Sequence, residues 1–310
     1  MNRRGFTKLA TLSVLAMGLR GQGVGAVSSP QFSITMDDFN WRNPVQLTAE
    51  ERNQKILKTL ADHRTKAALF VIGRNADAPE GMSLLRPWDD AGHLIGNHTY
   101  SHRSLNSDIT AAEFEQDIAR AETILIGLRQ FRKLFRYPAL KEGNTAPKRD
   151  QVRAFLRQKG YRVGHVTIDN SDWIVDQRLT ARLQKDPHAD TKPYRDFYLE
   201  HMWDRAEYYD ALAKKVLGRP VKHTILMHFN LLNGLFLGDL IEMFRSKGWQ
   251  LIDAEEAFTD AVFRAEPKIL PVGESIVWSL AKEKGTIAKS LRYPAEDGDY
   301  EMARMNKLGL

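Results

Sequence analysis

The sequence predicts an α/β fold, a distorted (β/α) barrel of about seven parallel strands. Short β-rich runs alternate with helical patterns from residue 30 onward, and such alternation is typical of parallel strands joined by crossover helices. Seven such units within about 230 residues favour a (β/α) barrel, complete or distorted. A doubly wound open sheet is the alternative, but the sequence contains no Gly-rich dinucleotide loop.

The expected strands cover residues 31–36, 67–72, 93–97, 133–137, 162–169, 223–229 and 249–253. Capping boxes at Thr48-Ala-Glu-Glu51 and Thr110-Ala-Ala-Glu113 each predict the start of a helix, because threonine and glutamate satisfy each other's free backbone N–H groups. Pro147 suits the first turn of another helix. Helical patterns also lie around 190–217 and 236–247, whereas 262–310 shows no clear period.

Composition and charge exclude several classes of protein. Hydrophobic residues make up 43% and charged residues 27% of the chain, which is typical of a globular protein. The absence of cysteine excludes disulfides, a thiol nucleophile and Cys-ligated zinc. Four of the six net positive charges fall in residues 1–26, which leaves 41 basic against 39 acidic residues and no basic stripe for nucleic acid.

Ionisable side chains gather where the expected strands end, which in a barrel of parallel strands is the face that carries active sites. They are Asp37 and Asp38, His98 and His102, Arg136, Asp169 and Asp172, and His228. The His98–His102 spacing lets two imidazoles converge on one metal from a helical turn, and Asp38 would complete an N/N/O site of the hydrolytic zinc type. Taken alone, each pattern is also compatible with a solvated face or a turn.

The remaining groups suggest acid–base partners. Arg136 lies in an apolar strand and needs a carboxylate, for which Asp37 is the candidate, although an ordinary structural ion pair fits as well. Alternation points Asp37 away from Asp38, so that one aspartate can bind metal while the other acts as a base. His228 is either a core histidine or a general acid whose tautomer is set by Asp172 or Asp169.

Five ordered motifs resemble those of the polysaccharide deacetylase family, the NodB-homology carbohydrate esterases of family four. They are Thr35-Met-Asp-Asp38, His98-Thr-Tyr-Ser-His102, Arg136-Tyr-Pro138, Asp169-Asn-Ser-Asp-Trp173 and Leu226-Met-His228. The resemblance covers roughly residues 31–260 and implies the same distorted barrel. The third motif departs from the family pattern, since Ala139-Leu140 replaces the usual aromatic residue and glycine.

The resemblance also implies a role for each site residue. Asp37 would be the catalytic base, oriented by Arg136, and His228 the acid, tuned by Asp172. A divalent metal, usually zinc with cobalt or nickel as alternatives, would bind the side chains of Asp38, His98 and His102. Trp173 and Leu226 would wall a pocket for the acetyl methyl group, and the Ala139 N–H would stabilise the oxyanion.

The resulting hypothesis is a metal-dependent hydrolase of non-peptide C–N bonds that removes N-acetyl groups, or O-acetyl groups by the same machinery, from a glycan. Peptidoglycan, chitin oligomers and an exopolysaccharide are all candidate substrates. The alternatives are a related amidohydrolase that acts on a small amide and a glycan-binding protein without turnover. Aromatic side chains beyond the motifs, Trp203, Tyr208, Tyr209 and Trp278, are expected in the core rather than on a sugar-binding surface.

The N-terminal residues predict export. Arg3 and Arg4, with Phe6 and Lys8, precede a short apolar run and resemble a twin-arginine signal, with small residues for cleavage near Ala26. The expected organisation is a signal peptide over 1–26, the deacetylase domain over 27–262 and a C-terminal extension over 263–310. No later apolar run is long enough for stable membrane insertion. We therefore expect a periplasmic or secreted bacterial protein, and the general secretory route would lead to the same destination.

Overall fold

The computed structural model describes Met1 and residues 29–270, 273–285, 291–292 and 298–310. The predicted signal peptide, apart from Met1, lies outside the described residues. None of the helices in the described ranges is long and apolar enough to cross a membrane.

Seven parallel strands form one curled sheet, which confirms the predicted fold class. The strands are β1 (Gln31–Asp37), β2 (Ala68–Val71), β3 (Leu94–Asn97), β4 (Phe131–Phe135), β5 (Arg162–Val163), β6 (Lys222–His228) and β7 (Gln250–Leu251). Their order is β5-β4-β3-β2-β1-β6, and β7 pairs with the start of β1. Because β1 and β6 pair along their whole length, Asp37 and His228 lie opposite each other at the carboxyl edge.

The predicted strand over 162–169 is wrong in its length. Regular pairing stops after Val163, and the chain then approaches β6 through a single bridge between Ile168 and Ile225. Thr167 supports that approach, since its backbone N–H donates to the Thr224 carbonyl at 3.1 Å. An irregular segment rather than a full strand therefore closes the ring between β5 and β6.

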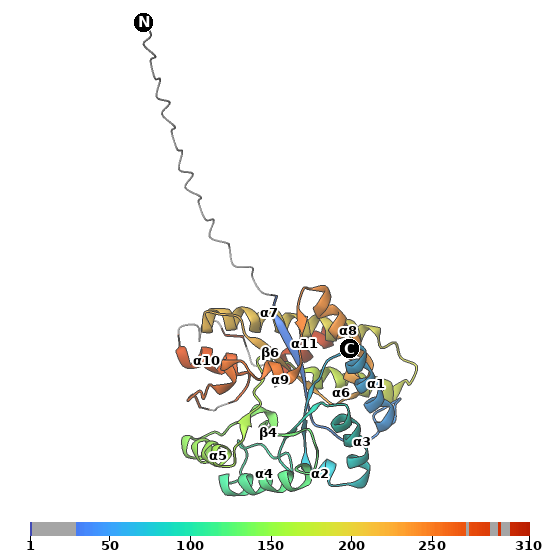
Figure 1. Ribbon diagram of the computed structural model, residues 1–310. Helices are drawn as coiled ribbons and strands as arrows, with labels where there is room; N and C mark the ends of the chain where they lie inside the picture. The colour runs from blue at the N-terminus through green and yellow to red at the C-terminus, as the bar shows by residue number, and fades with distance from the viewer. Residues whose placement is uncertain (2–28, 271–272, 286–290, 293–297) are drawn as a thin grey trace.

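Helices surround the sheet, with α7 and α8 on one side and α4 and α5 on the opposite side (Figure 1). Their bounds are α1 (Ala49–Asp62), α2 (Gly73–Ala76), α3 (Pro79–Asp90), α4 (Ala111–Leu125), α5 (Ala146–Gln158), α6 (Asp172–Lys185), α7 (Lys192–Leu217), α8 (Leu231–Ser246), α9 (Ala254–Ala257), α10 (Ile276–Lys284) and α11 (Asp299–Leu308), with 3-10 turns η1 (Pro138–Leu140) and η2 (Ala261–Arg264). Both capping boxes are confirmed, at the start of α1 and of α4. Pro147 lies in the first turn of α5, as expected.

The C-terminal extension, in which the sequence shows no period, contains α10 and α11. Of the aromatic residues expected in the core, Tyr209 and Trp278 are buried, and Trp203 and Tyr208 are partly buried against the same cluster. The Trp278 indole N–H donates to the Arg292 carbonyl at 3.0 Å, and α10 packs against α7. The extension is therefore packed onto the barrel wall.

Phe70 on β2 fills the barrel interior beneath the site. A methyl group on Gly96 would lie 2.6 Å from its ring, and one on Gly164 would lie 2.4 Å from it. The Arg136 guanidinium carbon lies 4.1 Å from the ring centroid. The two glycines thus leave the space that allows Phe70 to support Arg136.

We predict that Gly164→Ala lowers the free energy of unfolding by about 1–3 kcal/mol, because the added methyl group must displace the fully buried ring of Phe70. Urea unfolding of the full chain measures the change. Gly127→Ala is the matched control, since a methyl group there has nothing within 4 Å. Equal midpoints for both variants would show that the Phe70 packing tolerates the extra volume.

Candidate active site

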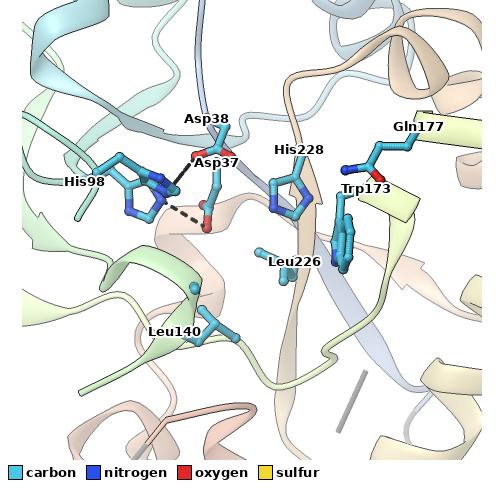
Figure 2. Close-up of a pocket in the computed structure, with 10 residues that line it drawn as sticks. Asp37, Asp38, His98, Leu140, Trp173, Gln177, Leu226 and His228 are labelled. Carbon is cyan, nitrogen blue, oxygen red and sulfur yellow. Dashed lines mark ion pairs between the residues drawn. The ribbon is translucent and has the colours of Figure 1, made fainter. Parts of the chain in front are cut away.

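A cavity of about 340 Å³ opens at the carboxyl ends of β1 and β6 (Figure 2). Its lining residues are Asp37, Asp38, His98, His102, Ala139, Leu140, Trp173, Gln177, Leu226 and His228. Eight of these ten were singled out by the sequence. The other two predicted residues, Arg136 and Asp172, are buried and contact the lining residues Asp37 and His228 from the side away from the cavity. The structure thus brings these ten predicted residues together, whereas Asp169 does not line the cavity.

Asp38, His98 and His102 form a group that could hold a metal ion, since one ligand atom from each lies within 4.8 Å of the others. Asp38 Oδ1 lies 3.0 Å from His102 Nε2 and 3.5 Å from His98 Nε2. Burial raises the pKa of Asp38, but the hydrogen bonds with His102 and His98 outweigh burial, so the pKa lies well below its ordinary value. An ionised carboxylate between two imidazoles suits a divalent cation.

The two histidines do not lie on a helical turn, so that part of the prediction is wrong. Residues 98–102 form a loop in which Thr99 and His102 have positive φ angles of 61° and 62°. The Thr99 N–H donates to Asn97 Oδ1 at 2.8 Å, and the His102 N–H donates to Thr99 Oγ1 at 2.9 Å. These local hydrogen bonds turn the loop back so that both imidazoles reach Asp38.

The tautomer of His98 is set by the backbone of β4's end. Its Nδ1 lies 2.8 Å from the Arg136 carbonyl oxygen, which can only accept, so Nδ1 carries the proton and donates it. Nε2 is the ring nitrogen that remains for the site, 3.5 Å from Asp38 Oδ1: it donates to this carboxylate when it carries a proton and offers a lone pair to a metal when it does not. Such an outer hydrogen bond is the usual support of a histidine that binds metal.

Asp37 and Arg136 form a buried ion pair. Arg136 Nη1 donates to the two carboxylate oxygens of Asp37 at 3.0 and 3.2 Å, and both side chains are almost completely buried. Arg136 Nη2 also donates to Thr35 Oγ1 at 3.1 Å, and Nε donates to the Gly164 carbonyl. With these contacts the guanidinium is satisfied, and Asp37 is held in one orientation at the cavity wall.

His228 and Asp172 form the second pair, and the open choice between Asp172 and Asp169 is decided in favour of Asp172. His228 Nδ1 lies 2.6 Å from Asp172 Oδ1. Burial lowers the pKa of His228, but the charge and hydrogen bond of Asp172 raise it to about 10. Burial raises the pKa of Asp172, and the charge and hydrogen bonds of His228 outweigh burial and lower it. The pair therefore holds a proton on His228 at neutral pH.

Asn233 is a site residue that the sequence analysis missed. Its Nδ2 donates to Asp172 Oδ2 at 2.8 Å and to the His228 carbonyl at 2.9 Å, while its Oδ1 accepts from the Tyr198 hydroxyl at 2.5 Å. Asp169, by contrast, is fully buried, and burial and then the charge of Glu274 raise its pKa to about 8. Asp169 does not contact His228 in the structure. The charge that acts on it most strongly is that of Glu274, in the C-terminal extension.

The remaining walls are less polar. Leu226 and Trp173 lie beside His228, and Gln177 follows Trp173 by one helical turn on α6 (Figure 2). Opposite them, Ala139 and Leu140 form the tight turn η1, in which both residues have positive φ angles of 50° and 55°. Leu140 and Gln177 were not predicted; the i, i+4 spacing from Trp173 is the signal that could have identified Gln177.

Comparison with known proteins agrees with the fold and the motifs. The family model for polysaccharide deacetylase matches residues 25–164, which include the first three motifs. A peptidoglycan-N-acetylglucosamine deacetylase of Bacillus cereus is 29% identical over 123 residues, 40% of this chain and 42% of the relative. A chitin deacetylase of a Pestalotiopsis species is 27% identical over 146 residues, 47% of this chain and 44% of the relative. The match thus spans less than half the length of either curated relative.

Solved structures support the fold. A CE4 family pseudoenzyme from Bacillus anthracis is 17% identical with a TM-score of 0.52, over 74% of this chain and 65% of that chain. A mutant CE4 family pseudoenzyme with restored enzymatic activity is 19% identical with a TM-score of 0.51, over 74% and 67%. At these identities the likeness concerns the fold alone, and it agrees with the distorted barrel. The resemblance that the motifs carry is confirmed over residues 25–164, which match the family model for polysaccharide deacetylase.

Proposed function

We propose that this chain is a metal-dependent hydrolase that removes acetyl groups, in the first place N-acetyl groups, from a glycan. The observation that carries the proposal is that two ionisable side chains with opposite kinds of partner line one cavity. Asp37 is held against a guanidinium on one side, and His228 is held protonated by Asp172 on the other. The candidate metal-binding side chains Asp38, His98 and His102 line the same cavity.

Asp38, His98 and His102 would hold the metal, for which zinc is our first choice and cobalt or nickel are alternatives. Two imidazole nitrogens and one carboxylate oxygen are a donor set of the catalytic type, which leaves coordination positions open. A divalent ion bound there would supply Lewis acidity, polarising the acetyl carbonyl and making nearby water more acidic.

Asp37 would act as the base. Its ion pair with Arg136 keeps the carboxylate oriented, and the buried surroundings exclude competing water. In this position it removes a proton from the attacking water as the new bond to the acetyl carbon forms. Arg136 acts through Asp37 and is a positioning residue.

His228 would act as the acid. Because Asp172 raises its pKa to about 10, the imidazole still carries both protons near neutral pH, and it has one to donate. When the C–N bond breaks, His228 Nε2 gives its proton to the leaving amine of the sugar. Acetate and a free amino sugar are the products.

The walls of the cavity would recognise the acetyl group. Trp173 and Leu226 present apolar surface beside His228, which suits a methyl group. On the other side the Ala139 N–H would donate a hydrogen bond to the carbonyl oxygen as negative charge develops there. We assign the substrate to the N-acetylated glycans, because the two curated relatives are a peptidoglycan-N-acetylglucosamine deacetylase and a chitin deacetylase.

A glycan-binding protein without turnover is the weaker alternative, because it needs neither a protonated histidine nor a base held by a buried guanidinium. A small-amide hydrolase would use the same groups, but the export-type N-terminal sequence favours a substrate outside the cytoplasm. We place the protein in the periplasm or outside the cell for that reason.

We expect the purified protein to release acetate only when it carries a divalent metal. The chain is stripped of metal, reloaded with zinc or cobalt, and assayed on chitin oligomers, peptidoglycan fragments and O-acetylated xylan. Release of acetate that requires the metal supports the deacetylase and names its substrate class. No release from any of these substrates, with one metal bound per chain, points to another glycan or to a small amide. No release with no metal bound favours the glycan-binding protein.

Asp37→Asn and Asp38→Asn should separate the base from the metal ligand. Asp37→Asn is expected to lower kcat about 10²- to 10⁴-fold with bound zinc unchanged, because a positioned base supplies an effect of that order. Asp38→Asn is expected to lose zinc and turnover together. Metal analysis and acetate release measure both variants. Full activity of Asp37→Asn would show that another group is the base.

Asp172→Asn should lower the pKa of His228 from about 10 toward its ordinary value of 6.5, because the charge that holds the proton is removed. Protonation of His228 adds to the free energy of unfolding of the wild type below pH 6.5, and this contribution is lost as the pH rises toward 10. In the variant the free energy of unfolding should not fall over this pH range for that reason. Titration of the His228 ring by NMR, with the exposed His188 as reference, measures the pKa. An unchanged pKa would contradict the role of Asp172.

A further inference from the structure

The turn that carries the proposed oxyanion donor has an unfavourable backbone. Ala139 and Leu140 both adopt left-handed conformations, which residues other than glycine disfavour because Cβ crowds the backbone. Within the turn, the Leu140 N–H donates to the Tyr137 carbonyl at 2.9 Å, and the Lys141 N–H donates to the Pro138 carbonyl at 3.2 Å. Such conformations persist when the surrounding structure holds them in place.

The support from outside comes from residues 273–275 of the C-terminal extension. Gly273 has a φ angle of +146° and packs on the turn so closely that a Cβ would lie 2.4 Å from the Leu140 carbonyl oxygen. The next residue, Glu274, forms an ion pair with Lys141, and the two side chains are only 16% and 26% exposed. Both ends of the Leu140–Lys141 peptide unit therefore face this segment.

The 273–275 segment is itself fastened to the barrel. The Ser275 hydroxyl donates to the Thr167 carbonyl at 2.7 Å, and the Ile276 N–H donates to the Val166 carbonyl at 2.9 Å. The Ser279 hydroxyl bonds back to the Gly273 carbonyl. Thr167 in turn bonds to β6, the strand that ends in His228. A continuous set of hydrogen bonds thus joins the segment to the irregular wall that closes the barrel.

We propose that Gly273 and Glu274 are positioning residues, which hold the Ala139–Leu140 turn so that the Ala139 N–H faces the reacting carbonyl. This rests on the proposed function, because Ala139 is the oxyanion donor only in that reaction. It gives the C-terminal extension a role in the active site. A glycine within the turn would adopt its left-handed conformation without such support. Here the close contact of Gly273 and the Lys141–Glu274 ion pair provide the support from a distant part of the chain.

Gly273→Ala tests the close contact, because the added methyl group must displace the Leu140 carbonyl. We expect kcat for acetate release to fall about 10- to 100-fold with KM within about twofold, since displacing a group that acts only in the transition state lowers kcat. Gly285→Ala is the matched control: it has a φ angle of +71°, but a Cβ there has nothing within 4 Å. The control should keep wild-type kcat, and both variants should keep bound zinc.

The ion pair is tested by Glu274→Gln, Lys141→Met and the exchange of the two charges in Lys141→Glu/Glu274→Lys. Each single variant should lower kcat by about threefold to tenfold, and the exchange should recover part of the loss. Glu266→Gln, which breaks the exposed pair with Arg157 in the same extension, is the control and should leave kcat unchanged.

Hydrogen exchange of the 136–145 peptides, followed by mass spectrometry on the full chain, gives a measure that does not depend on turnover. Faster exchange there in Gly273→Ala, but not in Gly285→Ala, is the expected result, and unchanged exchange would overturn the proposed support. Faster exchange with wild-type kcat would overturn the positioning role. A wild-type protein that releases no acetate would contradict the proposed function, while the exchange data still decide whether the segment holds the turn.

Discussion

The buried ion pair between Asp37 and Arg136 connects the parts of this protein that meet at the cavity. A guanidinium taken out of water is costly unless every donor finds an acceptor, and Arg136 finds them on β1 and on the segment after β5. Its plane rests over Phe70, and its backbone carbonyl accepts the hydrogen bond that sets the tautomer of His98. Arg136, directly after β4, therefore contacts a carboxylate, an imidazole of the candidate metal site and a ring of the barrel interior.

The other side of the cavity is built on a separate set of bonds. Asp172 accepts hydrogen bonds from the backbone and ring of His228 and from the side chain of Asn233. These partners, and not Arg136, hold its carboxylate in place. The two carboxylates, Asp37 and Asp172, thus have different partners. One faces a permanent cation, and the other shares a proton with a histidine, and it is on this difference that the proposed assignment of base and acid rests.

The third wall depends on residues far apart in sequence. The Ala139–Leu140 turn departs from the usual family motif, and it is supported by the C-terminal extension through Gly273 and Glu274. That extension also reaches the opposite wall, where a Cβ on Gly298 would lie 3.0 Å from the Trp173 ring. Gly273 and Gly298 thus pack against residues that line two walls of the cavity, so the extension supports the site from outside.

Local pattern in the sequence determined much of this protein. Strand–helix alternation predicts the parallel sheet, and the capping boxes predict the starts of α1 and α4. The need of Arg136 for a carboxylate predicts its pairing with Asp37. Each of these features depends on neighbouring residues or on the chemistry of one side chain. Only the tertiary structure decided the rest. The strand that begins at Arg162 ends early, where the chain bends toward β6. The imidazoles of His98 and His102 converge because the loop between them contains left-handed residues, not because they lie on a helix. The choice of Asp172 over Asp169, the part played by Asn233 and the contact of Gly273 with Leu140 are set by packing between segments from 35 to more than 100 residues apart, which no local pattern records.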